Sequence, residues 1–160
     1  MMKRSFKRKK GPVQSKKITY DGIKFASGLE RYMYMALKKA KIKAKYEGQT
    51  FELIPSFEFD LECIERQSNG KGEYKNRGNK KILNIKYTPD FIGKDFIIET
   101  KGRANESFPL RWKLFKRLLI ESNFITQSPI NWTLYKPQNQ KECDETIRLK
   151  LNTKEKLLFY

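Results

Sequence analysis

The strongest constraint on the fold of this chain is a stretch near its middle, residues 87–102, in which two apolar runs flank a short polar turn. These runs, with the turn at Gly93-Lys94-Asp95 between them, predict an antiparallel β-hairpin. In such a hairpin Asp90 lies nearly opposite Glu99, where cross-strand side chains can meet. Charges at the end of an apolar hairpin are costly to bury unless they bind something. The pattern therefore predicts a binding site at this end of the hairpin.

The residue types at this end favour a divalent metal ion. Glu99 and Lys101 are two residues apart and share a face of the strand, while Thr100 points away. Mg²⁺ or Mn²⁺ prefers carboxylate, water and phosphate oxygens, and the backbone carbonyl of Thr100 is a further oxygen beside the two acids. A bound ion polarises a phosphodiester and lowers the pKa of an attacking water, and Lys101 can neutralise charge that develops on the phosphate. The alternative interpretation is a solvated salt-bridge cluster at a strand end.

Composition narrows the chemistry further. The chain has 160 residues, enough for one domain with a hydrophobic core. It contains no histidine, which excludes Ser-His-Asp hydrolysis, Cys-His proteolysis and zinc sites built on imidazole. Its two cysteines, Cys63 and Cys143, are far apart in the sequence, which indicates a reducing compartment and no thiolate zinc site. A formal net charge of +17 points to a polyanionic partner, with nucleic acid ahead of an anionic membrane.

The first 17 residues form a basic arm that we expect to be disordered when free, and residues 18–160 form a single domain. The arm carries eight Lys or Arg and no acidic residue. It either tracks phosphates or serves as a solubilising tail. The arm residues predicted to contact nucleic acid are Lys7, Arg8, Lys9 and Lys10. No apolar run is long enough to span a membrane and no signal segment follows the basic start, so we expect a cytoplasmic protein that is not secreted.

A helix is predicted to begin just after Ser27 and to end near Lys41. Ser27 is a suitable N-cap, and Glu30 follows it at the spacing of a capping box. Apolar residues recur at helical spacing and define the face we expect to be buried: Leu29, Tyr32, Met33, Ala36, Leu37 and Ala40. From the residues alone, the capping role is the better interpretation of Glu30.

Between this helix and the hairpin, the pattern predicts a short strand at 42–47, a long strand at 50–64 and another strand at 82–92. In the long strand Phe57, Phe59, Leu61 and Cys63 alternate with acidic residues, which predicts that they are half-buried. Pro55 indicates an edge position or a bulge. Residues 65–81 are rich in Gly, Asn and Lys and predict a mobile basic loop, which either contacts DNA or is a neutral insertion.

The last third of the chain predicts a helix at 107–122, a strand at 130–135 and a helix at 139–149. The first of these helices has an apolar face, on which Trp112 is a core residue rather than a base-stacking platform. Its basic residues either grip phosphates or form a solvated face: Arg111, Lys113, Lys116 and Arg117. The order of elements predicts an α/β fold, a mixed β-sheet flanked by helices on two sides, with the strand–helix–strand unit at 95–135 as a parallel crossover.

Three motifs, taken together, resemble the PD-(D/E)xK nuclease superfamily. They are Phe-x-Ser-Gly-Leu-Glu at residues 25–30, Tyr-Thr-Pro-Asp-Phe at 87–91 and Ile-Glu-Thr-Lys-Gly at 98–102. The combination is similar to phage Holliday-junction resolvases of the endonuclease I type and to a phage nuclease-like family. More distantly, it resembles the N-terminal domain of transposon end-cleaving nucleases. The resemblance covers about residues 20–135 and implies a restriction-endonuclease-like fold.

The resemblance also implies roles for individual residues. Asp90 and Glu99 would be the metal ligands, Lys101 the catalytic lysine and Glu30 an additional carboxylate that reaches the metal directly or through water. Ser27 stays a cap or a phosphate contact, and Arg103 and the basic residues of the helix at 107–122 would contact nucleic acid beside the site.

The activity implied is that of a Mg²⁺- or Mn²⁺-dependent endodeoxyribonuclease, phage-encoded and active in the host cytoplasm. Its substrate would be branched DNA, and a homodimer follows from the resolvase resemblance because junction cutting needs two active sites. Two alternatives stay open: a nicking or site-specific nuclease on linear duplex DNA, and a non-catalytic basic nucleic-acid-binding protein.

Overall fold

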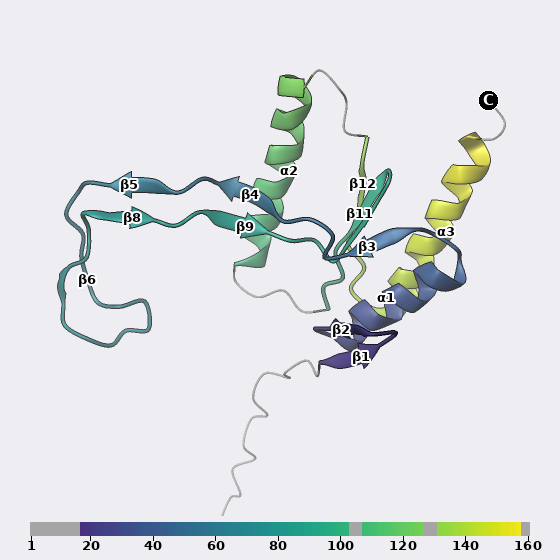
Figure 1. The fold of residues 1–160 in the computed structure, drawn as a ribbon, viewed down its shortest axis with the longest axis horizontal. Helices are drawn as coiled ribbons and strands as arrows, with labels where there is room; N and C mark the ends of the chain where they lie inside the picture. The colour runs from purple at the N-terminus through teal and green to yellow at the C-terminus, as the bar shows by residue number, and fades with distance from the viewer. Residues whose placement is uncertain (1–16, 103–106, 127–130, 158–160) are drawn as a thin grey trace, which may run out of the picture. The chain divides into compact units, whose positions relative to one another are not determined.

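The computed structural model describes residues 17–102, 107–126 and 131–157, which have a mixed α/β fold (Figure 1). Their internal contacts divide them into two units. In the first unit the described residues are 17–42, 100–102 and 137–157, and in the second they are 43–99, 107–126 and 131–136. The predictions for residues 1–16 therefore lie outside the described residues.

The first unit begins with a β-hairpin and contains two helices: β1 (Ile18–Tyr20), β2 (Ile23–Phe25), α1 (Gly28–Lys39) and α3 (Gln140–Leu157). The turn between β1 and β2 is Asp21-Gly22, and both of its residues have positive φ, 56° and 75°. That conformation suits the twist of a two-residue hairpin and favours glycine.

Helix α1 confirms the predicted start and the predicted apolar face, with Met33 and Leu37 buried. It packs against α3, and the Tyr32 hydroxyl donates to the Asp144 carboxylate at 3.0 Å. Helix α3 runs further than the 139–149 predicted from the sequence. At its start, the amide of Glu142 donates to the Asn139 side chain at 2.9 Å, a side-chain cap that the sequence analysis did not identify.

The second unit contains a four-stranded mixed sheet in the order β12-β11-β10-β3. Its strands are β3 (Ala44–Tyr46), β10 (Phe91–Gly93), β11 (Phe96–Ile98) and β12 (Thr133–Tyr135). Pairing is antiparallel from β3 through β11 and parallel between β11 and β12. Helix α2 (Phe108–Thr126) connects the parallel pair, so the predicted strand–helix–strand crossover is confirmed.

The hairpin at the centre of the sequence argument is present as β10 and β11, with one correction. Its turn contains two residues, Lys94 and Asp95, and Gly93 belongs to β10. A Cβ atom on Gly93 would lie 2.1 Å from the ring of Phe96. Glycine at this position therefore serves close ring packing rather than the turn.

Helix α2 covers one face of this sheet with aromatic side chains. Ile97 of β11 is fully buried in a cluster with Phe108, Trp112 and Phe115 of α2, and Tyr87 belongs to the same cluster. The Phe115 ring lies 4.8 Å from the Tyr87 ring and 4.9 Å from the Phe51 ring, measured between centroids. The core interpretation of Trp112 is confirmed, since it is 8% exposed.

A long two-stranded ribbon replaces the single strand predicted at 50–64 and the loop predicted at 65–81 (Figure 1). Its paired strands are β4 (Phe51–Ile54) with β9 (Ile85–Tyr87), β5 (Phe57–Phe59) with β8 (Lys80–Ile82) and β6 (Ile64–Glu65) with β7 (Lys75–Asn76). A register shift between Glu52 and Ile54, next to Pro55, is the irregularity that the proline indicated. The predicted strand at 82–92 is likewise divided among β8, β9 and β10.

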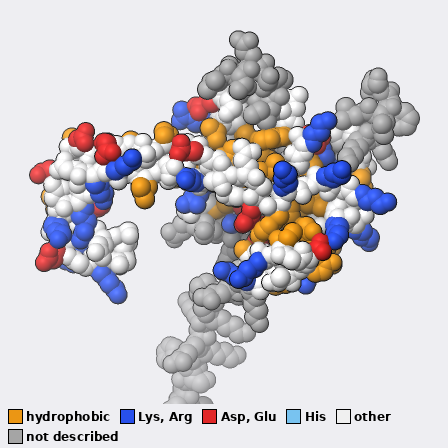
Figure 2. Space-filling view, viewed as in Figure 1, with side chains coloured by type: hydrophobic (Ala, Val, Ile, Leu, Met, Phe, Trp, Pro, Cys, Tyr) orange, Lys and Arg blue, Asp and Glu red, His pale blue; other side chains and the backbone are white. Residues whose placement is uncertain are grey.

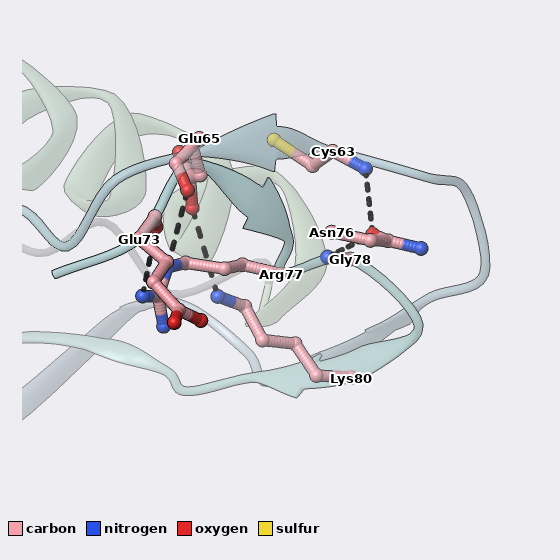
Figure 3. Close-up of polar contacts among 7 residues, drawn as sticks. All are labelled: Cys63, Glu65, Glu73, Asn76, Arg77, Gly78 and Lys80. Carbon is pink, nitrogen blue, oxygen red and sulfur yellow. Dashed lines mark hydrogen bonds and ion pairs between the residues drawn. The ribbon is translucent and has the colours of Figure 1, made fainter.

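The tip of the ribbon is held by its own polar groups, which is why residues 65–81 are not the simple loop predicted (Figure 3). The Asn76 side chain accepts from the amides of Cys63 and Gly78 at 3.1 and 2.9 Å. The Arg77 guanidinium donates to the backbone carbonyls of Glu65 and Glu73.

Burial along the ribbon also differs from the alternation expected. Phe57 is 49% exposed and Leu61 is 68% exposed, although both were predicted to be half-buried. The reason is that β5 pairs with β8 in a two-stranded sheet, which buries far less of a side chain than a packed sheet face. Lys and Arg side chains are interspersed with Asp and Glu along this ribbon (Figure 2). Among the described residues, no helix is long and apolar enough to cross a membrane.

Candidate active site

The candidate site lies where β10 begins and β11 ends. The pairs Phe91–Ile98 and Ile92–Ile97 define the register, and its continuation by one residue places Asp90 opposite Glu99. The amide of Glu47 donates to the Asp90 carbonyl at 2.8 Å, and the Glu99 amide donates to the Tyr135 carbonyl at 3.0 Å. Pairing to the neighbouring segments thus holds both backbones, and the continued register agrees with the predicted position of this pair; that the two side chains meet stays a prediction.

Burial distinguishes the two carboxylates. Glu99 is 4% exposed, while Asp90 is partly exposed at the edge of the core. Pro89 is fully buried, and its ring restricts the backbone that leads into Asp90. The candidate site therefore combines a buried carboxylate with a partly exposed one, at the ends of two paired strands.

Tyr87 is the residue that the sequence analysis missed. Its hydroxyl donates to Glu99 Oε2 at 2.8 Å. Burial raises the pKa of the Tyr87 hydroxyl well above its usual range, and the charges of Glu99 and Asp90 raise it further. The hydroxyl therefore stays protonated at physiological pH and acts as a donor that orients the glutamate. The signal available in the sequence was a tyrosine in an apolar strand, because a buried phenol usually needs a hydrogen-bond partner.

The donor set of this site fits a magnesium ion. Mg²⁺ is commonly bound by one or two carboxylates, with water and substrate phosphate completing its six ligands. Asp90 and Glu99 supply two carboxylates on neighbouring strands, and Tyr87 supplies the outer hydrogen bond that commonly orients a metal ligand. In the described ranges, no group of three or more His, Cys, Asp or Glu side chains is arranged to hold a metal, so water and substrate would have to complete the coordination.

Glu30 lies in the first unit, and the structure confirms its capping role. The Ser27 hydroxyl accepts from the Glu30 amide at 3.2 Å and donates to Glu30 Oε1 at 2.8 Å. The Ala26 amide donates to Glu30 Oε2 at 2.9 Å, and the residue is only 7% exposed. Two of these three contacts use the carboxylate, which has about four acceptor positions when ionised, and the metal role of Glu30 stays a prediction.

Thr100 and Lys101 also belong to the first unit. Thr100 is buried, Lys101 is partly exposed, and the Lys101 amide donates to the Pro137 carbonyl at 3.0 Å. The predicted sharing of one face by Glu99 and Lys101 joins residues of different units and stays a prediction.

Comparison with known proteins assigns the chain to a family. A family model described as "Protein of unknown function (DUF1064)" matches residues 10–130, which is more than half of the chain. The chain belongs to the DUF1064 family. The matched range includes the capping segment, the β10–β11 hairpin and α2. No curated protein and no solved structure matches the chain.

Within the DUF1064 match, the basic residues predicted on α2 are all exposed. Two of them already have partners on the helix: Lys116 lies 5.5 Å from the Trp112 ring centroid, and Arg117 pairs with Glu121 at 2.6 Å. Arg111 and Lys113 are exposed as well, so a phosphate role stays a prediction for the set. The remaining predicted contacts lie outside the described residues: Lys7, Arg8, Lys9, Lys10 and Arg103.

Proposed function

We propose that this DUF1064 protein is a metal-dependent endodeoxyribonuclease with a restriction-endonuclease-like fold. The observation that carries the proposal is the β10–β11 register, which sets Asp90 opposite Glu99 with Tyr87 bonded to the buried glutamate. Support for the fold comes from the mixed sheet and its parallel crossover through α2. Two of the three PD-(D/E)xK-like motifs, at residues 87–91 and 98–102, adjoin β10 and β11, and the third, at residues 25–30, lies at the start of α1 in the first unit.

The proposed chemistry is hydrolysis of a phosphodiester. A water oxygen attacks phosphorus, the bond from phosphorus to the leaving oxygen breaks, and the products are a phosphate monoester and a free hydroxyl end. Asp90 and Glu99 would bind Mg²⁺ or Mn²⁺. The Thr100 carbonyl and Glu30 belong to the first unit, and their part as further ligands rests on the sequence motifs alone. The bound ion supplies Lewis acidity, which lowers the pKa of the attacking water and stabilises charge on the phosphate. Lys101 would neutralise charge that develops on the phosphate oxygens.

The proposed substrate is DNA, and branched DNA in particular. The net charge of +17 supports a polyanionic substrate. The preference for branches and the homodimer that junction cutting requires rest on the resemblance to resolvases, and linear duplex is the alternative substrate.

The test is cleavage of supercoiled plasmid, linear duplex and a four-way junction by the purified protein with Mg²⁺ or Mn²⁺. We expect cleavage that stops with EDTA and is faster on the junction. Lys101→Ala should slow it by about 10²-fold or more, the loss typical when a preorganised electrostatic group is removed. Lys86→Ala, which removes an exposed lysine on β9, is the matched control and should cleave normally.

Each alternative has a distinct outcome. Equal rates on junction and duplex would remove the branched-DNA preference and leave a general or nicking nuclease. DNA binding without cleavage in either metal would contradict the nuclease proposal and leave the non-catalytic binding protein.

Tyr87→Phe tests how Glu99 is oriented. The variant keeps the ring that packs against Trp112 and Phe115 but loses the hydroxyl bonded to Glu99. We expect cleavage or metal affinity to fall about 10- to 100-fold, as is typical when a metal ligand loses its outer hydrogen bond. Because the tyrosine does not titrate near neutral pH, the shape of the pH–rate profile should not change between about pH 6 and 9.

The matched control is Tyr34→Phe, which also removes a hydroxyl bonded to a carboxylate, at 2.7 Å from Asp21 on an exposed surface. Tyr34→Phe should retain full activity and metal affinity. If the two variants behave alike, Tyr87 has only a packing role.

A further inference from the structure

The second unit contains a pocket that no proposed catalytic residue lines. It has a volume of about 390 Å³ and lies at the β3 edge of the sheet. Its lining combines three lysines with small residues and one amide side chain: Lys43, Ala44, Lys45, Gly48, Gln49, Ile92, Gly93 and Lys94. None of these described lining residues is acidic, so the pocket concentrates positive charge.

The strand register makes this concentration of charge unfavourable in the absence of a ligand. Ala44 pairs with Gly93 and Lys45 with Ile92, so one further step places Lys43 opposite Lys94. Like charges directly opposite each other on neighbouring strands destabilise a sheet. Lys43 and Lys45 are two apart and share a face, so three ammonium groups converge there. Across the described residues, none of the three makes an ion pair with a carboxylate.

The backbone around these lysines is well defined. The Trp132 indole donates to the Lys94 carbonyl at 3.1 Å, which holds the turn in place. A Cβ atom on Gly48 would lie 2.6 Å from Cβ of Lys45, so glycine allows the chain to turn closely against the pocket. The lysines are therefore presented from anchored strand and turn positions and not from a free tail.

We infer that this pocket binds a phosphate group. Three ammonium groups, one side-chain amide and exposed backbone form a donor set suited to phosphate oxygens. The phosphate could be carried by a nucleic-acid backbone or by a free nucleotide, since both present the same oxygens. Phosphate binding by itself does not require that the protein cut DNA.

The position of the pocket relative to Asp90 favours a nucleic-acid backbone as the source of the phosphate. By strand alternation, Lys94, Ile92 and Asp90 lie on one face of the sheet. Four residues of strand span roughly 13 Å, which is about the rise of four nucleotides along one strand of a duplex. A backbone phosphate in the pocket would then hold one substrate strand a few nucleotides from Asp90. This placement rests on the proposed function.

The test compares two triple variants of the full chain. Lys43→Gln, Lys45→Gln and Lys94→Gln together empty the pocket of charge. Lys24→Gln, Lys86→Gln and Lys141→Gln together remove the same charge from exposed positions that are predicted to contact neither phosphate nor DNA. Duplex DNA binding is measured with Ca²⁺ in place of Mg²⁺ over a range of salt concentrations. We expect the pocket variant to bind DNA about tenfold more weakly than the control. The slope of log affinity against log salt concentration should also be flatter, by about one unit for each phosphate that the pocket lysines neutralise in the wild type.

A second measurement uses inorganic phosphate and a nucleoside monophosphate as probes. In the wild type, both should shift the amide NMR signals of Gly48 and Gly93, and in the pocket variant neither should. If the pocket variant loses these NMR shifts but binds DNA as tightly as the control variant, the pocket binds free phosphate compounds rather than DNA. Shifts absent from the wild type, together with equal DNA binding, would overturn the site.

These measurements do not depend on cleavage. A protein that never cuts DNA but shows the expected binding difference would contradict the nuclease proposal and retain the pocket. Normal cutting with no binding difference from the control would retain the nuclease and contradict the pocket.

Discussion

Asp90→Asn and Glu99→Gln should each abolish Mg²⁺-dependent cleavage, with a loss of about 10³-fold or more. A bound metal ion contributes several kcal/mol of transition-state stabilisation, and each 1.4 kcal/mol is about a factor of ten in rate. Both substitutions keep the shape of the side chain and remove the charge that binds the ion. Single-turnover cleavage of plasmid and junction DNA measures the loss.

A stability measurement separates loss of the metal from loss of the fold. If the pair binds Mg²⁺, the ion at 100 times its dissociation constant should raise the free energy of unfolding of the wild type by about 2.7 kcal/mol. Asp90→Asn should show little of that gain, while its stability without metal stays within about 1 kcal/mol of the wild type. Glu58→Gln, on the exposed part of β5, is the charge-matched control and should behave as the wild type in both assays.

Full activity in both Asp90→Asn and Glu99→Gln would contradict the assignment of the site. DNA cleavage would then have to use carboxylates outside the β10–β11 hairpin.

Phe115→Ala should be the most destabilising of these substitutions. Phe115 is fully buried, and its ring contacts Phe51, Tyr87 and Trp112 with centroids 4.8 to 5.9 Å apart. Truncating a buried phenylalanine costs about 3–5 kcal/mol through lost transfer free energy and the cavity left behind. For a chain of this size that corresponds to a fall in Tm of about 10 °C or more. Thermal unfolding followed by circular dichroism measures it.

The matched control is Leu110→Ala on the same helix. Leu110 is 59% exposed, so its truncation should change stability by less than about 0.5 kcal/mol. Similar losses in the two variants would show that α2 does not hold the sheet through Phe115. Phe115→Ala should also lower metal affinity, because the Tyr87 ring packs against the Phe115 ring.

Elements whose signals are local were predictable from the sequence. The capping of α1 needs only the Ser27–Glu30 spacing, and the β1–β2 turn needs only Asp21-Gly22. The pairing of Asp90 with Glu99 follows from a turn whose two strands are adjacent in the chain, so register could be counted from the turn. A three-residue turn at Gly93-Lys94-Asp95 would set Asp90 opposite Ile98, one residue from Glu99. The observed two-residue turn shifts the register by one residue, and its continuation sets Asp90 opposite Glu99.

Predictions failed where the outcome depended on what covers a strand. Alternation along Phe57, Phe59 and Leu61 looks like a half-buried strand whether a helix covers it or not. The ribbon is two-stranded here, and two of these side chains are exposed. Likewise, Gly and Asn in residues 65–81 are typical of a loop, yet Asn76 and Arg77 bond the two sides of a hairpin tip.

The sequence by itself determined the hairpin, its paired carboxylates, the helix cap and the absence of histidine, because each depends on neighbours within a few residues. Only the tertiary structure decided that Tyr87 bonds Glu99 and that β3 pairs with β10, which brings Lys43 and Lys45 beside the strand that leads to Lys94. These contacts join segments up to about fifty residues apart, whose pairing depends on the packing of the whole sheet and not on local periodicity.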